Sequence, residues 1–470
     1  MRTLAASGLS LVTLVTLALA SPDARATPHP TPEQLVEVRG VPGSPPHMPV
    51  PDVTPAQATA QLALIAAWDK TMQSLACINP DAGIDGGQEE CRFGGIIEVE
   101  SGPGHDIVES DNTQEAIWNW SYNQKLSADT QFRPQVANAF QYLATHPGWL
   151  EWRDGNGTGP DYYSVYNCGW GVRAVIEYEL ATGDASQHAY GDMCAQHLTD
   201  YAKVNTGDPL IIAATTAWGA SGLWLWGNAN NLPQVKTQAA TIGAQVKAWV
   251  EADPTRLASR VWAATGGAAF YGVVASYMKE NPSELNAWVA QMAPHLGGWI
   301  DESMPAVPND WTDWRNAHNA WNMLGHFTAA DVLGPGAGDI DKAAAMDILS
   351  RLVAQATNGD GAIAGSQQRP ATEAESWITA YLVYFGLREI IDAPEQPDGG
   401  MATPDASLSG DGGPVTTRPD AGGGNGAAPG GGSSSSGCGC AEAGVGDESA
   451  WALALVPLVA LVARKRRTSR

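Results

Sequence analysis

Apolar and polar positions between residues 55 and 391 alternate between two kinds of helical segment. In one kind, apolar and small residues surround the helix on all sides, as in AATTAWGASGLWLWG (213–227). In the other, apolar residues form a single stripe, as in KTQAATIGAQVKAWVEAD (236–253). A helix that is apolar all round is buried on several faces, whereas an amphipathic helix covers a core with one face. The pattern therefore predicts inner and outer helices in alternation.

The helical periodicity and the turn residues between the segments predict twelve helices. Outer helices are expected over 56–75, 132–145, 187–203, 233–251, 284–300 and 339–356, and inner helices over 110–126, 163–180, 211–228, 257–278, 312–330 and 372–391. Each inner segment carries a Trp, at intervals of roughly fifty residues, which is the scale of a helical hairpin. Six such hairpins predict an all-α fold, an (α/α)6 toroid over residues 55–391. An open solenoid is the alternative, but no segment looks like a polar capping repeat.

The last hairpin carries a resemblance to known proteins. Its loop GDGAI (359–363) and its helix ATEAESWITAYLVY (371–384) resemble the closing hairpin of α/α-toroid proteins, a group that includes six-hairpin glycosidases, polysaccharide lyases and terpenoid cyclases. In that group a Gly/Asp loop meets an inner helix that here carries Trp377, Thr379, Ala380 and Tyr381. The resemblance implies the toroid fold, which by itself does not give a function. The acidic DxDD motif of squalene-hopene-type cyclases is absent, which argues against cyclase chemistry.

The two ends of the chain are expected to serve export. A positive start and an apolar core from Leu9 to Ala20 predict a signal peptide over 1–26, cleaved near Ala20 or Ala26, with a retained membrane anchor as the alternative. A Pro-rich arm follows over 27–54. Residues 392–437 are rich in Gly, Pro and Ser with almost no large apolar residue, which predicts a disordered linker.

Residues 438–470 resemble the MYXO-CTERM sorting tail. They contain Cys438 and Cys440, a short apolar run over 451–463 and a basic cluster over 464–467. The resemblance implies a membrane segment, processing near the cysteines by a sorting protease, and display at the cell surface. A plain membrane anchor is the alternative. In both cases the basic end stays cytoplasmic, which leaves the toroid outside.

The charge and the cysteines limit which ligands, disulfides and metal ions are expected. A formal net charge of −24 argues against nucleic acid, because phosphate binding needs clustered Lys and Arg. Export permits disulfides, and we pair Cys77 with Cys91 and Cys168 with Cys194, although four cysteines allow three connectivities. No zinc-type spacing is present. The loop DGNGTGPD (154–161) has oxygen ligands but lacks the EF-hand pattern, so no cofactor is expected, with Ca²⁺ as a minor alternative.

Polar and aromatic residues near the starts of the inner helices are the candidates for chemistry. In a toroid these starts converge on a shared mouth. The predicted catalytic acids are Asp111, Glu115, Asp313 and Glu375, and the predicted substrate-binding residues are Trp118, Tyr166, Trp311, Trp314, Arg315 and His318. A glycosidase needs two carboxyls, whereas a lyase needs a base and a charge-stabilising donor, for which Tyr166, Arg315 and His318 are suited.

Each candidate also has a purely structural interpretation. Asp111 precedes a helix and could only cap it, and Thr372 with Glu375 has the spacing of a capping box. His318 and the tryptophans could belong to the core. We therefore expect an exported polysaccharide hydrolase or lyase. The alternatives are a noncatalytic surface module that binds a glycan or another surface ligand and, more weakly, isoprenoid chemistry. Detection of a cleaved product separates the enzyme from the binder.

Overall fold

The computed structural model describes residues 51–75, 92–102, 104–105, 107–150, 160–201, 209–261, 264–300 and 314–393. The predicted signal peptide, the sorting tail, the Cys77–Cys91 disulfide, and almost all of the Pro-rich arm and the linker lie outside these residues. In the part that is described, no helix is long and apolar enough to cross a membrane.

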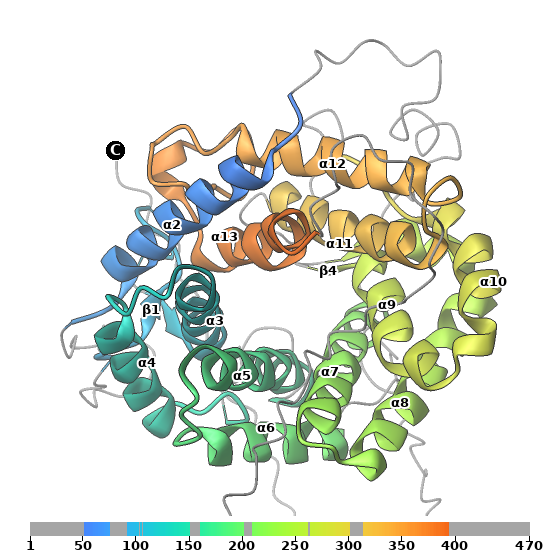
Figure 1. The fold of residues 1–470 in the computed structure, drawn as a ribbon, viewed down its shortest axis with the longest axis horizontal. Coiled ribbons are helices and arrows are strands. Elements are labelled where there is room, and N and C mark those ends of the chain that lie inside the picture. Colours follow the sequence, from blue (N-terminus) through green and yellow to red (C-terminus); the bar gives the residue numbers. More distant parts are fainter. Residues whose placement is uncertain are drawn as a thin grey trace, which may run out of the picture. The chain divides into compact units, whose positions relative to one another are not determined.

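In the described part of the chain, helices alternate between an outer and an inner ring, as Figure 1 shows. The outer helices are α2 (Pro55–Met72), α4 (Arg133–Thr145), α6 (His188–Tyr201), α8 (Pro233–Ala252), α10 (Pro282–Met292) and α12 (Asp339–Val353). The inner helices are α3 (Ser110–Ser127), α5 (Pro160–Thr182), α7 (Pro209–Ala229), α9 (Gly266–Gly272), α11 (Arg315–Leu333) and α13 (Ser376–Leu382). Each inner helix contacts the next, and α13 contacts both α11 and α3, so the ring closes. The predicted all-α toroid is confirmed, and the open solenoid is excluded.

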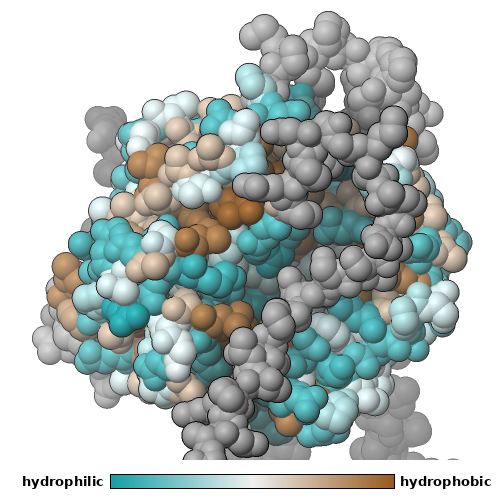
Figure 2. Space-filling model, in the orientation of Figure 1, coloured by the Kyte–Doolittle hydropathy of each residue, from teal (hydrophilic) through white to brown (hydrophobic). Residues whose placement is uncertain are grey.

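Burial separates the two rings as the sequence pattern predicts. Every residue of α3 from Ser110 to Gln124 is buried. The outer helix α4 buries only a stripe, which consists of Val136, Ala139, Phe140, Tyr142 and Leu143. The face of the ring in Figure 2 is mostly hydrophilic, with hydrophobic residues in small separate groups. Apolar burial between the two rings therefore supplies the main stabilisation.

The last inner helix continues beyond α13. A π-helical turn, η5 (Val383–Leu387), and the short α14 (Arg388–Ile391) extend it to Ile391. A second π-helical turn, η2 (Val273–Met278), extends α9 in the same way.

Two predicted helices are shorter than expected. The expected helix over 284–300 ends at Met292 and passes through the 3₁₀ turn η3 (Ala293–His295), because Pro294 has no N–H to donate to the helix. The expected helix over 257–278 begins only at Gly266, after the 3₁₀ turn η1 (Pro254–Ala258) and the hairpin of β3 (Arg260–Val261) and β4 (Ala264–Thr265).

Close helix contacts depend on small residues. A Cβ atom at Gly267 of α9 would lie 2.3 Å from the carbonyl oxygen of Trp321 in α11, and one at Gly272 would lie 2.4 Å from the Cβ of Ala217 in α7. Real Cβ atoms do not approach other atoms so closely, so glycine at both positions lets α9 sit tightly between its neighbours.

Aromatic side chains fill the centre of the inner ring. Phe385 is fully buried, and its ring centroid lies 4.4 Å from that of Trp321 and 4.9 Å from that of Tyr381. Trp218 of α7 packs edge-on against Trp321 at 5.3 Å. The guanidinium of Arg173 in α5 lies 3.4 Å from the Trp218 ring centroid and is buried with it. Packed aromatic pairs and this cation–π contact join four inner helices.

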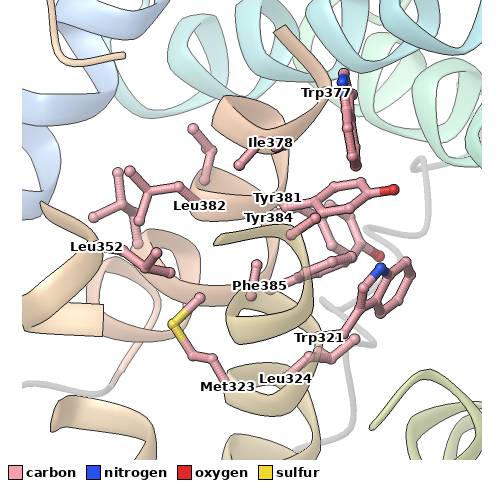
Figure 3. Close-up of a cluster of buried hydrophobic side chains, with 14 of the residues drawn as sticks. Trp321, Met323, Leu324, Leu352, Trp377, Ile378, Tyr381, Leu382, Tyr384 and Phe385 are labelled. Atoms are coloured by element: carbon pink, nitrogen blue, oxygen red, sulfur yellow. The ribbon is translucent and has the colours of Figure 1, made fainter. Parts of the chain in front are cut away.

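The two faces of α13 differ in character, as Figure 3 shows. Trp377 and Tyr381 lie with Trp321 on one side, whereas Ile378 and Leu382 face Leu352 of α12 on the other. The first side is directed at the centre of the ring and the second at the outer layer.

The predicted Cys168–Cys194 disulfide is not formed. Both residues are buried and both are free thiols, although Cys194 is close enough to be a hydrogen-bond partner of the Cys168 thiol. Burial raises the pKa of the Cys168 thiol well above its ordinary value, and Cys194 raises it further. The two cysteines predicted to pair are neighbours in the structure, but both are free thiols.

Removing the aliphatic face of α13 should destabilise the ring. Leu382→Ala should lower the free energy of unfolding by about 2–5 kcal/mol, because Leu382 is fully buried and the substitution leaves a cavity. Leu180→Ala is the matched control on α5, where the side chain is 66% exposed, and it should change stability by less than about 0.5 kcal/mol. Urea unfolding of both variants checks this, and equal losses would contradict the packing described.

Candidate functional site

The amino-terminal ends of the inner helices converge on one pocket. The volume of the pocket that no protein atom occupies, including the solvent at its mouth, is about 510 Å³. All six inner helices contribute to the lining, and the segment before α3 adds two carboxylic acids. The lining residues are Glu98, Glu109, Asp111, Asn112, Tyr163, Tyr166, Ala214, Thr215, Trp218, Ala268, Trp314, Trp321, Trp377 and Tyr381. The convergence expected from the toroid is therefore observed.

Two carboxyl groups in the pocket share one hydroxyl. The hydroxyl of Tyr163 lies 2.8 Å from Glu109 Oε2 and 2.8 Å from Asp111 Oδ2. These two oxygens are therefore no more than twice that distance apart. A hydroxyl carries one hydrogen and can donate to only one of the two oxygens at a time.

Local structure places both acids at the start of α3. Glu109 ends β2 (Val108–Glu109), which pairs with β1 (Ile96–Ile97) in a short antiparallel hairpin. Thr113 ties this hairpin to the helix, because its hydroxyl donates to Glu109 O at 2.8 Å and accepts from Ile96 N at 3.0 Å. Asp111 lies in the first helical turn, where its Oδ1 accepts from the backbone N–H of Asn112 at 2.9 Å. The helix dipole favours a negative charge there.

The alternative interpretation of Asp111 as an N-cap does not hold. The N-cap of α3 is Glu109, and it makes no hydrogen bond from its side chain to the helix. Both carboxyls are instead directed at Tyr163, which lines the pocket.

Aromatic rings form the other walls of the pocket. Trp314 meets Trp377 edge-on at 5.2 Å, and Trp377 meets Tyr381 edge-on at 5.5 Å. Trp218 and Trp321 continue this surface into the aromatic centre of the ring. Seven of the fourteen lining residues are aromatic, so most of the pocket wall is apolar.

A buried hydroxyl network adjoins the aromatic wall. Tyr166 and Tyr381 share a short hydroxyl–hydroxyl hydrogen bond. The Tyr166 hydroxyl also lies 3.1 Å from Glu115 Oε1 and accepts from Trp170 Nε1 at 3.0 Å. Burial raises the pKa of the Glu115 carboxyl well above its ordinary value, and the negative charge of Asp111 raises it further. Glu115 is 1% exposed and lies outside the pocket lining, behind Tyr166.

A second buried acid lies further out, on α2. Asp69 is 1% exposed, and its Oδ2 accepts a hydrogen bond from Asn119 at 2.9 Å. Burial raises the pKa of Asp69 from 3.8 to about 7, against the lowering effect of the Asn119 hydrogen bond.

The structure divides the predicted site residues. Asp111, Tyr166 and Trp314 line the pocket. Trp118 instead belongs to the core, where it stacks on Tyr122 at 4.9 Å. Arg315 and His318 are buried but are not among the lining residues. Asp313, Trp311 and the loop over 154–159 lie outside the described residues.

Glu375 forms an ion pair at the start of α13. Its carboxylate is fully buried in an ion pair with Arg369, which also contacts Glu373 at 3.1 Å. Glu375 is itself the N-cap residue of α13 and makes no hydrogen bond from its side chain to that helix, so the predicted capping box with Thr372 is absent. Glu375 does not line the pocket, because the ion pair holds it at the entry of the helix.

Sequence reasoning missed several lining residues. Glu109 and Glu98 come from the segment before α3, which the helical pattern did not cover. Trp321 lies seven residues after Trp314 and Tyr381 lies four after Trp377, spacings that put each pair on one helix face. That spacing is the signal that could have identified them.

No group of three or more His, Cys, Asp or Glu side chains suited to holding a metal ion is found in the described part of the chain.

Comparison with known proteins gives a distant structural likeness. No family model matches the chain, and no curated protein matches it. Among solved structures it is similar to the GH76A α-1,6-mannanase from Salegentibacter sp. HEL1_6, with 9% identity and a TM-score of 0.49, over 71% of this chain and 98% of that one. An inactive variant of that enzyme in complex with α-1,6-mannotriose gives 10% identity and a TM-score of 0.48, with the same coverage. At these values the likeness supports no argument about activity or substrate.

The buried acid on α2 makes stability depend on pH. Between about pH 4 and pH 7, folded Asp69 keeps a proton that the unfolded chain has released, so stability falls as pH rises, by up to about 1.4 kcal/mol per pH unit. Asp69→Asn should reduce this slope, since the amide does not titrate, whereas Leu180→Ala, which removes no ionisable group, should leave it unchanged. Urea unfolding across this pH range measures both slopes. An unaltered slope in Asp69→Asn would contradict the burial of this acid.

Proposed function

We propose that this chain is a carbohydrate-active enzyme, a glycoside hydrolase that acts at the pocket formed by the inner-helix starts. The observation that carries the proposal is the pair of carboxyls that share the Tyr163 hydroxyl. Two acids bridged in this way are close together. Retaining glycosidases have their carboxyls about 5–5.5 Å apart, whereas inverting enzymes keep them about 6.5–9.5 Å apart to admit a water. The upper limit set by the shared hydroxyl favours the retaining geometry.

The bridging hydroxyl also favours one protonated and one ionised acid. Because Tyr163 has one hydrogen for two acceptors, the second contact needs a hydrogen from a carboxyl. Asp111 lies in the first turn of α3, where the helix dipole and the Asn112 N–H stabilise its negative charge. We therefore assign the ionised role to Asp111 and the protonated role to Glu109.

These roles define a two-step reaction. Asp111 attacks the anomeric carbon while Glu109 gives its proton to the leaving glycosidic oxygen, which forms a glycosyl ester on Asp111. Glu109 then takes a proton from an incoming water, whose oxygen attacks the same carbon and releases Asp111. Tyr163 holds both carboxyls in place through its hydroxyl.

The aromatic wall is assigned to substrate binding. Sugar rings have apolar faces that pack on indole rings, and Trp314 and Trp377 lie at the starts of adjacent inner helices. A lyase is less well supported, because only Tyr166 of the three residues suited to its chemistry lines the pocket, whereas Arg315 and His318 do not.

A second candidate is isoprenoid binding. The observation in its favour is the largely aromatic lining, which would also accept a hydrocarbon chain. A noncatalytic glycan-binding module would use the same wall without cleavage. The experiment below separates all three.

Substitution of the two acids tests the hydrolase. The full-length chain is incubated with a panel of β-glucans, xylans, uronate polymers and mannans, including α-1,6-mannan, and reducing ends are measured. On the substrate that is cleaved, Asp111→Asn and Glu109→Gln should each lower kcat by about 10²–10⁴-fold, because each removes an essential carboxyl. Asp347→Asn, a surface carboxylate on α12, is the matched control and should retain wild-type activity.

The configuration at the anomeric carbon of the first product shows whether the reaction retains or inverts that configuration. Proton NMR during the reaction should show retention of configuration. Full activity of both variants, or inversion, would overturn the assignment. Glycan binding without any product would favour the binding module. Binding of farnesol or squalene, with no glycan bound, would favour the isoprenoid alternative.

We also propose that the chain is exported and held at the cell surface by its carboxy-terminal tail, with a sorting protease as its processing partner. The apolar segment over 9–20 and the ending formed by Cys438, Cys440, the apolar run and the basic cluster support this. Mass spectrometry of the protein released by surface proteolysis of intact cells should find a mature amino terminus after Ala20 or Ala26. Detection of residues 1–20 on the mature protein, or failure of surface proteolysis to release it, would contradict export.

A further inference from the structure

A chain of hydrogen-bonding groups leads from a buried acid to the pocket. Glu115 contacts Tyr166, and Tyr166 contacts Tyr381, whose hydroxyl also interacts with the indole N–H of Trp321. Tyr166 and Tyr381 both line the pocket, whereas Glu115 does not. Figure 3 shows the Tyr381 oxygen on the side of α13 that carries Trp377.

The direction of these hydrogen bonds depends on one proton. A tyrosine oxygen accepts at most two hydrogen bonds and donates one. The indole N–H of Trp170 already donates to Tyr166. If Glu115 is neutral and also donates to Tyr166, the Tyr166 hydrogen must point to Tyr381. The hydrogen of Tyr381 is then directed into the pocket. If Glu115 is ionised, Tyr166 donates to it and Tyr381 donates to Tyr166, which leaves the Tyr381 oxygen as an acceptor.

The surroundings of Glu115 favour the neutral form. Its Oε2 is buried and has no hydrogen-bond partner among the described residues. An ionised carboxylate with an unsatisfied oxygen in a buried site is costly. The charged and titratable groups that act on it are Asp111 on its own helix, Glu109 on β2, Asp69 on α2 and Tyr166 on α5. The three acids are negative or neutral, so none stabilises a carboxylate.

We propose that Glu115 is a positioning residue, which stays neutral and donates to Tyr166, so that Tyr381 presents a hydrogen-bond donor to the pocket. The pocket then selects a ligand with an acceptor oxygen at that point, such as a ring or glycosidic oxygen or a hydroxyl. The ligand class rests on the proposed glycan function, whereas the proton position and the hydrogen-bond direction do not. This inference replaces the predicted catalytic role of Glu115.

Infrared spectroscopy tests the proton position without any ligand. At neutral pH the full-length chain should show the C=O band of a neutral carboxylic acid that Glu115→Gln lacks. This variant keeps the shape of the side chain and so should fold. Asp69→Asn is the control, since it removes another buried acid whose pKa is raised and leaves the Glu115 band in place. Identical carboxylic-acid bands in the wild type and Glu115→Gln would overturn the proposal.

The same spectra test the direction of the hydrogen bonds that link Glu115, Tyr166 and Tyr381. With ring-labelled tyrosine, the difference between the wild type and Tyr381→Phe isolates the C–O band of Tyr381, which responds to donation and acceptance by its hydroxyl. As pH is raised until the fold is lost by circular dichroism, the Glu115 and Tyr381 bands should change together or both remain constant. In Glu115→Gln the Tyr381 band should not change. A change in one band without the other would overturn the coupling, whatever the outcome of the glycan assays.

Discussion

The packing of aromatic side chains at the centre of the inner ring is the constraint on which the rest of the structure depends. Phe385, Trp321, Tyr381 and Trp218 come from three inner helices and touch one another through their rings. They fill the space that six helices in a ring would otherwise leave open. Two of them, Tyr381 and Phe385, lie in α13 and its extension η5. Because α13 also contacts both α11 and α3, the ring can close only when the last hairpin is in place.

The same packing determines where chemistry can occur. With the centre filled, the open space that remains lies where the inner helices begin, and there the pocket combines acids with aromatic walls. Six helix amino termini point toward this space, so their dipoles favour negative charge in it. Asp111 is placed to benefit from this effect. Glu115, one turn further along α3, is enclosed by protein and is far better suited to hold a proton than to attack a sugar.

Much of this architecture could be predicted from the sequence, because it rests on periodicity. The all-apolar and amphipathic helices, their alternation and the closing hairpin follow from side-chain patterns over many residues. The candidate site was only partly predictable. Glu109 ends a two-residue strand, which is too short to show a pattern, and Glu375 is neutralised by Arg369 across a loop, a contact that spacing does not reveal. The early end of the helix before Pro294, by contrast, could have been predicted from the sequence, because proline has no N–H to donate within a helix. Cys168 and Cys194 were correctly placed together, yet proximity does not determine whether two thiols are oxidised.

The central claim is that the space at the inner-helix starts is a glycan site in which Glu109 and Asp111 flank the bond that is broken. The most direct measurement is a crystal structure of the full-length Asp111→Asn chain with an oligosaccharide of the glycan that gives the strongest signal in the panel. We expect a sugar ring packed on Trp314 or Trp377, with its glycosidic oxygen within hydrogen-bond distance of Glu109. An oligosaccharide bound on the outer ring, with the pocket free of sugar, would contradict the claim.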